Sequence, residues 1–425
     1  MAQIASSAVP EFQAPRGMRD VLAPESARWS TLVATFAEHA RRGGFGLVLT
    51  PLVEHFEVFQ RVGDSTDIVR KEMYDFEDKG GRRVALRPEI TAGLMRAFVE
   101  HRPTVPWKVW TVGPNYRYEQ PQAGRYRQHF QLDAEIVGTD DPDADVEVIA
   151  LLDGFHRALG LRDRTLLVNS LGDAAGRPAY LGALRAHLEA HAADLSTESR
   201  ETLVVNPLRV LDSKRPVDQD VIGAAPHTLD YLTDESAAHF DHVRSGLSSL
   251  GIEFRIEPRL VRGLDYYTRT IFKFAGHSLQ GAQNAIGGGG RYDGLVEQLG
   301  GPPTPAVGFG AGIERILQAC DAEGVFATAD AAVDVFVVDT AGADDGLVIS
   351  QELQRAGIAT GRAYEHRSMK AQMRAAGRSG AAVAVIVGPD ERAAGTVVVR
   401  PMRGGDGQAV VARPDLLEHL EKLLP

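Results

Sequence analysis

The sequence has little of what marks a secreted, membrane-bound or disulfide-linked protein. Its single cysteine, Cys320, excludes an internal disulfide and any metal site built from several cysteines. The longest apolar stretches, such as Ala381–Val387, are far too short to cross a bilayer. Residues 1–12 lack the basic start and the apolar run of a signal peptide. We therefore expect a cytoplasmic protein with no membrane partner.

Two widespread nucleotide-binding motifs are absent as well. Neither G-x-x-x-x-G-K-[ST] nor G-x-G-x-x-G occurs anywhere in the chain, so a bound nucleotide would need another kind of site. The net charge of -11 argues only weakly against a nucleic-acid partner. Binding to phosphates depends on local basic patches and not on the total charge.

The length of 425 residues predicts two or three domains. Residues 1–14 are expected to be disordered, and residues 15–325 to form one large domain. Within that domain, residues 73–138 show mostly strand patterns, and residues 172–250 are helix-rich and are interpreted as an insertion. Residues 331–425 alternate strand and helix, which predicts a smaller α/β domain.

Four segments carry residues suited to chemistry. The first, YRYEQPQAGRYRQHFQ, runs from Tyr116 to Gln131 and is typical of two strands joined by a tight turn. Alternation places Arg117 and Glu119 on one face of the first strand, which is expected to reach Glu119. Arginine beside carboxylates suits a triphosphate next to an amino acid, because guanidinium binds phosphate oxygens in bidentate fashion.

The return strand, residues 128–137, alternates between apolar and polar side chains. Gln131, Asp133 and Glu135 share one face of it. A solvated sheet face is one interpretation of this pattern, and a polar floor that accepts a ligand is the other. Nothing in the strand alone decides between them.

The other three segments are weaker when taken singly. LVRGLDYYTRT (260–270) brings two arginines and two tyrosines near one glycine, but it also fits a core strand. GGGGRYDG (287–294) predicts a glycine-rich turn at residues 287–290, which is either flexible or close to a ligand. VGFGAGIER (307–315) predicts a strand-to-helix junction with Arg315 about one turn into the helix.

Together and in this order, the four segments resemble the histidyl-tRNA synthetases, a family of class II aminoacyl-tRNA synthetases. PRGMRD from Pro15, LRPEIT at Leu86–Thr91 and NPLRVLDSK at Asn206–Lys214 match that family too. The resemblance implies an α+β fold: a catalytic domain built on an antiparallel sheet with a helical insertion, followed by an α/β anticodon-binding domain. Gly44–Pro51 resembles the segment whose proline lies at the dimer interface in this class, which implies a homodimer.

The resemblance implies that histidine binds in two parts. Glu89, Thr91 and Gln131 would hold its ammonium group. Glu135 and Tyr267 would read the ring nitrogens of the imidazole, with Tyr292 nearby. A carboxylate and a phenol can together donate to and accept from both nitrogens. Tyr266 is also implied to bind histidine.

ATP is the implied second substrate. Arg117 would bind the α-phosphate, Glu119 the adenine edge and Arg315 the γ-phosphate. Arg262 would bridge the histidine carboxylate and the α-phosphate, so Arg117 and Arg262 are the implied catalytic residues. The residues implied to bind ATP are Arg117, Glu119, Arg125, His129 and Arg315.

The implied reaction is attack of the histidine carboxylate on the α-phosphorus, which gives histidyl-adenylate and pyrophosphate. A ribose hydroxyl of the terminal tRNA adenosine then attacks the adenylate carbonyl. Positioning and electrostatics would supply the rate, with Mg²⁺ on the phosphates and no metal held by protein side chains alone.

The implied tRNA contacts lie in two places. Gln120 and Gln122, at the turn of the first segment, would face the extra 5′ nucleotide of histidine tRNA. In the last domain, a basic helical face would contact the anticodon arm, while Met369, Met373 and Ala376 face the core. A merely solvated face is the alternative. The basic residues are Arg367, Lys370, Arg374 and Arg378.

Three positions depart from the family pattern. Gln120 stands where arginine is usual. His129 precedes Phe130, whereas the family has phenylalanine first, to stack on adenine. Lys273 stands where glutamate is common. Such departures keep a second reading open, a synthetase-like regulatory subunit that senses histidine for a phosphoribosyltransferase. Such subunits typically lack the anticodon-binding domain and parts of the active site.

A third reading, an amino-acid-sensing domain of a larger signalling protein, fits poorly because no kinase-like segment is attached. The retained Arg117, Glu119, Arg262 and Arg315 and the last domain favour the enzyme.

Overall fold

The computed structural model of the protein describes residues 12–63, 66, 68–121, 124–279, 284–327, 333–342, 344–364, 367–402 and 407–424. The predicted disorder of residues 1–14 falls mainly on residues 1–11, which lie outside the described residues. The chain divides into two compact units. The first comprises Met1–Val21 and Trp29–Ala327, and the second comprises Leu22–Arg28 and Thr328–Pro425.

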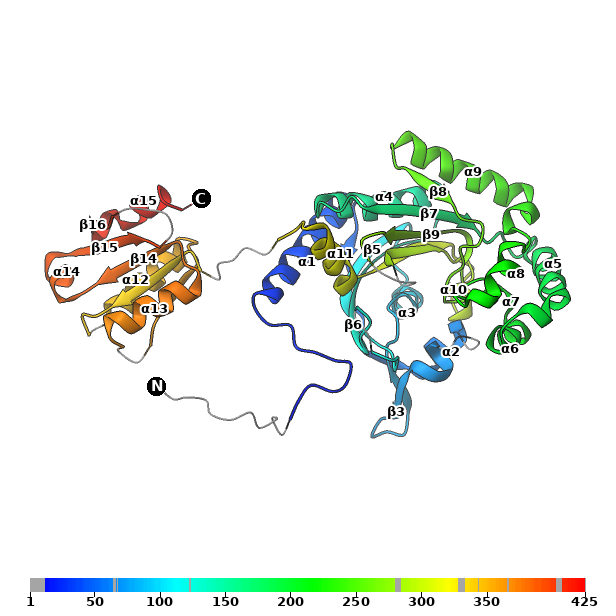
Figure 1. Ribbon diagram of the computed structural model, residues 1–425, viewed down its shortest axis with the longest axis horizontal. Helices are drawn as coiled ribbons and strands as arrows, with labels where there is room; N and C mark the ends of the chain where they lie inside the picture. Colours follow the sequence, from blue (N-terminus) through cyan, green and yellow to red (C-terminus); the bar gives the residue numbers. More distant parts are fainter. Residues whose placement is uncertain are drawn as a thin grey trace. The chain divides into compact units, whose positions relative to one another are not determined.

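An eight-stranded sheet forms the centre of the first unit (Figure 1). Its strand pairs are antiparallel except at the two edges, where β1 pairs with β5 and β8 pairs with β7 in parallel. In spatial order the strands are β1 (Gly46–Leu47), β5 (Trp107–Tyr116), β6 (Gln128–Val137), β11 (Ala306–Gly312), β10 (Ala285–Arg291), β9 (Thr268–Gly276), β7 (Arg164–Ser170) and β8 (Phe254–Ile256).

The two faces of this sheet are covered differently. One face packs into the larger apolar core, where Ala134 and Phe309 of the sheet meet Phe36 and Phe155 of the covering helices. Burial of such aromatic and aliphatic surface contributes about 25 cal/mol per Å². The helices on this face are α1 (Glu25–Arg42), α4 (Asp143–Ala158), α9 (Asp234–Ser249) and α11 (Ile313–Glu323).

The opposite face is only partly covered, and it carries the polar side chains of β6. A second core, which includes Phe59, Met95 and Leu295, closes one end of it. The elements there are α2 (Phe56–Gly63), the π-helix η1 (Ile68–Glu72), α3 (Thr91–His101), α10 (Leu295–Gln298) and a small antiparallel sheet of β2 (Val53–His55), β4 (Arg83–Leu86) and β3 (Tyr74–Glu77).

A helical segment joins β7 to β8 and is called the insertion below. It has its own small core around Tyr180, Leu184 and Leu203. Besides α9 it contains α5 (Arg177–Ala190), η2 (Ala192–Asp194), α6 (Thr197–Val205), α7 (Pro207–Val210), η3 (Pro216–Asp218), α8 (Gln219–Gly223) and η4 (Thr228–Tyr231). The insertion is thus helix-rich, as expected, although η4 is a single 3₁₀ turn.

The predicted glycine-rich turn at residues 287–290 is also wrong. These glycines lie inside β10, between β9 and β11, where the backbones approach closely. A Cβ on Gly288 would lie 2.6 Å from the carbonyl oxygen of Phe272, and one on Gly289 would overlap that of Gly308. Glycine is thus required by close packing of the sheet and not by a turn.

Two further expectations need correction. The first strand of the predicted hairpin ends at Tyr116, not at Glu119, because the chain beyond it leaves the ladder. The stretch 73–138 is not all strand, since Thr91–His101 forms the buried helix α3. Its glycine and its β-branched residues weaken the helical pattern, but the second core overrides that local preference.

The second unit is a five-stranded mixed sheet flanked by helices. Valines dominate its core, for example Val335, Val385 and Val399. Its elements are β12 (Val335–Asp339), α12 (Asp345–Arg355), β13 (Thr360–Arg362), α13 (Met369–Ser379), β14 (Val383–Val387), α14 (Pro389–Ala394), β15 (Thr396–Pro401), β16 (Ala409–Ala412), η5 (Arg413–Asp415) and α15 (Leu416–Glu421). Among the described residues, no helix is both long and apolar enough to cross a membrane.

Candidate active site

A cavity of about 670 Å³ opens on the polar face of the large sheet. Its floor comes from β6, β9, β10 and β11, and the insertion supplies part of its wall. Of the residues implied by the sequence, it brings together Arg117, Glu119, Arg125, His129, Gln131, Arg262 and Arg315. The wall contributed by the insertion includes Leu211, Asp212, Ser213, Lys214, Gln219 and Ile222.

One end of the cavity is strongly cationic. Arg125 forms an ion pair with Glu119, and Nε of Arg117 donates to the carbonyl oxygen of Pro88 at 2.8 Å. Nε of Arg315 donates to the carbonyl oxygen of Gly124 at 3.3 Å. Burial lowers the pKa of the Arg117 guanidinium, and nearby carboxylates oppose that shift. Converging guanidinium groups of this kind suit a polyphosphate.

His129 lies on the cavity wall, whereas Phe130 points to the other side of β6. The Phe130 ring meets Trp29 edge to face, with the centroids 4.9 Å apart. Burial lowers the pKa of His129 to about 3, and Arg117 and Arg315 add to that effect. The imidazole is therefore neutral at physiological pH. The exchange of the two residues thus leaves a ring at the position implied to face adenine.

A closed polar cluster lies at the inner end of the cavity. The Tyr292 hydroxyl donates to Oε2 of Glu135, and Oγ1 of Thr91 donates to Oε1 at 2.8 Å. Glu135 is 1% exposed. A Cβ on Gly308 would overlap the Glu135 carboxylate, so glycine on β11 leaves the room that this group occupies. The rings of Tyr266 and Tyr292 meet at 5.4 Å.

Burial shifts the acids of this cluster upward. It raises the pKa of Glu135 well above its usual range, although Tyr292 donates to the carboxylate. It also raises the pKa of Glu89, whose Oε1 accepts from the backbone N–H of Ala92 at 2.8 Å. The face of β6 that could have been solvated is therefore desolvated. Strongly shifted acids at a cavity mark a candidate functional site.

The implied histidine site is thus split between two places. Gln131 lines the open cavity, whereas Glu135, Tyr292, Tyr266 and Tyr267 lie behind its wall, each less than 9% exposed. Glu89 and Thr91 stand at the start of α3, next to this cluster. The structure therefore places the residues implied for the imidazole together, in one closed group.

Several polar residues of the site have no role implied by the sequence. Asp133 lies on β6 between Gln131 and Glu135, and burial together with Glu89 raises its pKa to about 8. Its position on the polar face of β6 was the available signal. Nδ2 of Asn115 donates to Gln131, and Glu314 accepts from the backbone N–H of Phe130 at 3.1 Å. The first contact joins β5 to β6 and the second joins α11 to β6, so no local pattern reveals them.

Arg262 lies at the boundary between the cavity and the cluster. Its guanidinium carbon is 5.4 Å from the ring centroid of Tyr267. A Cβ on Gly288 would lie 3.0 Å from its Nη1, so the glycine-rich strand leaves space for this arginine. Lys273, which departs from the family pattern, lines the same cavity. Burial lowers its pKa, and Lys214 and Arg262 add to that shift.

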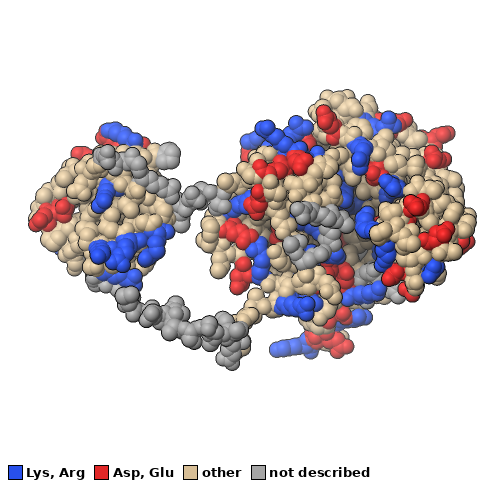
Figure 2. Space-filling model, viewed as in Figure 1, with Lys and Arg blue, Asp and Glu red and all other residues tan. Residues whose placement is uncertain are grey.

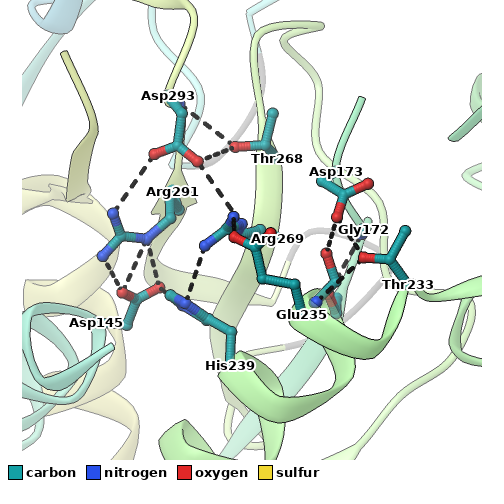
Figure 3. Close-up of polar contacts among 12 residues, drawn as sticks. Asp145, Gly172, Asp173, Thr233, Glu235, His239, Thr268, Arg269, Arg291 and Asp293 are labelled. Carbon is teal, nitrogen blue, oxygen red and sulfur yellow. Dashed lines mark hydrogen bonds and ion pairs between the residues drawn. The ribbon is translucent and has the colours of Figure 1, made fainter. Parts of the chain in front are cut away.

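A buried ion-pair network involves the two residues that flank Tyr292 in the chain (Figure 3). Asp145 on α4 accepts from Arg291 at the end of β10, and both side chains are 0% exposed. Nη1 of Arg291 also lies 3.4 Å from Oδ1 of Asp293. Arg291 and Asp293 flank Tyr292 in the chain, so the network fixes the backbone on both sides of that residue.

The residues implied to contact tRNA lie elsewhere. Gln120 is exposed beyond the end of β5, and Gln122 lies outside the described residues. In the second unit, Figure 2 shows Lys and Arg atoms gathered over the part that holds α13. The four basic side chains of this face are all exposed: Arg367, Lys370, Arg374 and Arg378.

One prediction for this helix is wrong. Met369 is 42% exposed instead of facing the core. Gln372 takes the buried position, and it accepts from the backbone N–H of Asp339 at 3.0 Å. Met373 packs against the core and Ala376 is buried within it, as expected.

Comparisons with known proteins agree with this geometry. A family model described as histidyl-tRNA synthetase matches residues 17–316, and one described as an anticodon binding domain matches residues 333–423. The chain is 46% identical to a histidine–tRNA ligase of Rhodococcus erythropolis, with 96% of this chain and 99% of that protein covered. It is 44% identical to one from Geobacillus thermodenitrificans, with 93% and 95% covered.

A solved structure gives the same result. The apo histidyl-tRNA synthetase of S. aureus is 32% identical, covers 96% of this chain and 99% of its own, and superposes with a TM-score of 0.80. The implied class II fold is therefore confirmed. By sequence, by fold and by the matched residues, this chain belongs to the histidyl-tRNA synthetase family.

Proposed function

We propose that this protein is a histidine–tRNA ligase, which activates L-histidine with ATP and transfers it to histidine tRNA. The observation that carries the proposal is the adjacency of two chemically different sites. An arginine-lined cavity suited to a triphosphate adjoins a buried carboxylate–phenol cluster suited to an imidazole, and Arg262 lies between them. Full-length identity to histidine–tRNA ligases supports the same assignment.

In the activation step, the arginines of the cavity hold the triphosphate. Arg117 binds the α-phosphate and Arg315 the γ-phosphate, which places the β- and γ-phosphates as the leaving group. The adenine lies beside His129, with Glu119 accepting from its edge. Charge grows on the oxygens around the α-phosphorus during attack, and fixed guanidinium groups there stabilise that charge most.

Histidine reaches the same phosphorus from the cluster side. Glu135 and Tyr267 read the imidazole, and Glu89, Thr91 and Gln131 bind the ammonium group. Arg262 holds the carboxylate of histidine against the α-phosphate. Because no protein nucleophile takes part, holding the two reactants in line supplies much of the rate.

Magnesium fits this site as a companion of ATP. Among the described residues, no group of three or more histidine, cysteine, aspartate or glutamate side chains could hold a metal ion alone. Mg²⁺ is commonly bound through one or two carboxylates together with substrate phosphates, and Glu314 on the cavity wall is the candidate ligand. When bound, the ion neutralises charge on the phosphates.

Transfer to tRNA needs contacts outside the cavity. The basic face of α13 binds the anticodon arm, in line with the match to an anticodon binding domain. The exposed Gln120, together with Gln122, meets the acceptor end. We also propose a homodimer through the segment around Pro51. Leu47, Leu49 and Leu52 are 53%, 69% and 41% exposed there, an apolar patch that a second subunit would cover.

Charging of tRNA tests this proposal. Purified protein, ATP, Mg²⁺ and histidine should give acid-precipitable histidyl-tRNA with histidine tRNA and none with another tRNA. A regulatory subunit would bind histidine without charging. Absence of charging, with histidine bound in a calorimeter, would favour that alternative.

A further inference from the structure

The segment that follows Arg262 is held by the insertion. Nη2 of Arg209, on α7, donates to the carbonyl oxygen of Gly263 at 2.9 Å and lies 3.3 Å from Oδ1 of Asp265. Nδ2 of Asn206, the N-cap residue of α7, donates to the same carboxylate oxygen at 3.0 Å. Two neighbouring side chains of the insertion thus bind two of the three residues that follow the catalytic arginine, Gly263 and Asp265.

A third contact holds the far end of the segment. Arg177, at the start of α5, donates through Nη2 to the carbonyl oxygen of Tyr267 at 2.6 Å. The insertion therefore touches positions 263, 265 and 267, every second residue of the segment. Residues 263–266 form a bend and a turn ahead of β9, so the insertion holds an irregular segment through directed contacts at three points.

Packing alone does not fix Arg262. A second hollow of about 380 Å³ lies on the insertion side, lined by Arg177, Asn206, Arg209 and Asp265. Val261 and Arg262 line both this hollow and the catalytic cavity. The chain at Arg262 is thus a thin wall between two spaces. Directed polar contacts are what can hold such a wall, because dense core packing is missing on both sides.

The insertion itself is anchored at its base, close to the sheet (Figure 3). Asp173, where the chain enters the insertion, accepts from Thr233 and from Ser236 at 2.6 Å, where α9 begins the return. Glu235 on α9 pairs with Arg269 on β9. A fixed base lets α5 and α7 act as a rigid support for the segment they hold.

We propose that Arg209, Asn206 and Arg177 are positioning residues that set the location of the Arg262 guanidinium for histidine activation. This inference rests on the proposed function of the site. Arg262 must meet the histidine carboxylate and the α-phosphate at once, and a misplacement of about 1 Å in such a geometry costs on the order of 10²-fold in rate.

The test is pyrophosphate exchange into ATP without tRNA. Arg209→Ala should lower kcat about 10- to 100-fold and leave KM for ATP and for histidine within about threefold, because the contact acts through the transition state. Arg209→Lys should recover part of kcat, since an ammonium group reaches one of the two acceptors. Arg215→Ala is the matched control: Arg215 is also in the insertion, and its Nε lies 3.6 Å from Oε2 of the exposed Glu198.

A double variant separates positioning from a general structural role. If Arg209 acts through Arg262, Arg209→Ala adds little further loss in the Arg262→Ala background. The proposal would be overturned if the losses of kcat from the two substitutions multiplied in the double variant. It would also be overturned if Arg209→Ala raised KM for both substrates and lowered the melting temperature. Unchanged kcat in Arg209→Ala would overturn it as well. Failure of the wild-type protein to exchange at all would instead count against the proposed function.

Discussion

The open cavity and the closed cluster beside it use charged side chains in opposite ways. In the cavity, Arg117, Arg125 and Arg315 converge, and the carboxylates of the lining do not balance the positive charge. The cavity therefore suits an anion. In the cluster, Glu135 is satisfied by Tyr292 and Thr91 before any ligand arrives. One region is prepared by unbalanced charge and the other by a closed hydrogen-bond network.

This contrast explains how two substrates can be selected by different means. A triphosphate is recognised mainly by its charge, which tolerates water in the cavity. An imidazole is recognised by matched donors and acceptors, and a desolvated site rejects a ligand that leaves one of them unpaired. Variants in the two regions should therefore fail in distinguishable ways.

The largest effect is expected at the boundary between the regions. Arg262→Ala should lower kcat for histidine activation about 10³-fold, because it removes a donor aimed at charge that develops in the transition state. Histidine binding measured by calorimetry should weaken only a few-fold. Arg244→Ala, at an exposed pair on α9, is the control. Near-normal activation by Arg262→Ala would remove this residue from the mechanism.

In the closed cluster, Glu135→Gln should lower kcat/KM for histidine about 10²-fold and leave KM for ATP unchanged. Glutamine keeps the shape but supplies only one acceptor oxygen where the carboxylate supplies two. Steady-state exchange with each substrate varied in turn measures this. An equal rise in KM for histidine and in KM for ATP would mean that the two regions are not separable.

The closed region should also carry a pH dependence, through Asp133. Burial and the neighbouring Glu89 raise the pKa of Asp133 from an ordinary 3.8 to about 8 in the folded chain. Between these values the folded state binds the extra proton, so stability falls as pH rises from 4 to 8. Asp133→Asn should remove on the order of 2 kcal/mol of that loss. The free energy of unfolding of the wild type and of Asp133→Asn is measured with urea at pH 5 and at pH 7.5. The same change with pH in both proteins would mean that Asp133 makes no such contribution.

Substitutions in a third region, the basic face of α13, should change the use of neither histidine nor ATP. Arg374→Ala combined with Arg378→Ala should lower kcat/KM for tRNA charging about tenfold, reduce its salt dependence, and spare pyrophosphate exchange. Arg355→Ala with Lys422→Ala removes equal charge from elsewhere in the same unit and is the control. Equal loss in exchange and charging would argue against an anticodon contact.

The smallest effect is expected for His129, the ring proposed to face adenine. His129→Phe should lower KM for ATP about threefold, because phenylalanine stacks more strongly than a neutral imidazole. KM for histidine should not change. A higher KM for ATP would show that the imidazole makes a polar contact with the nucleotide.

Much of the local structure could be predicted from the sequence. β6 has the predicted bounds, residues 128–137, because apolar and polar side chains alternate over most of its length. β10 could not be predicted, since four consecutive glycines favour a turn and only the neighbouring backbones explain their place in a strand. The exposure of Met369 could not be predicted either, because Gln372 takes the buried position and accepts a hydrogen bond from Asp339 on β12.

The residues of the site could be predicted from the sequence, but their division between an open cavity and a closed cluster could not. Motifs indicated Glu135 and Tyr292, which are 157 positions apart, and the structure brings them into contact. No pattern along the chain reveals that Glu135 is already paired, that Asp133 is buried next to it, or that Arg209 and Asn206 hold the segment after Arg262. Such features arise only when distant strands and the insertion meet.

The most direct test of the account is exchange of pyrophosphate into ATP by the purified protein with Mg²⁺ and no tRNA, with each amino acid supplied in turn. The account predicts robust exchange with histidine alone, because the cavity accepts ATP with any amino acid but the closed cluster accepts only an imidazole. Exchange with several amino acids would contradict the role of the cluster. No exchange with histidine, despite binding of both substrates, would contradict the ligase itself.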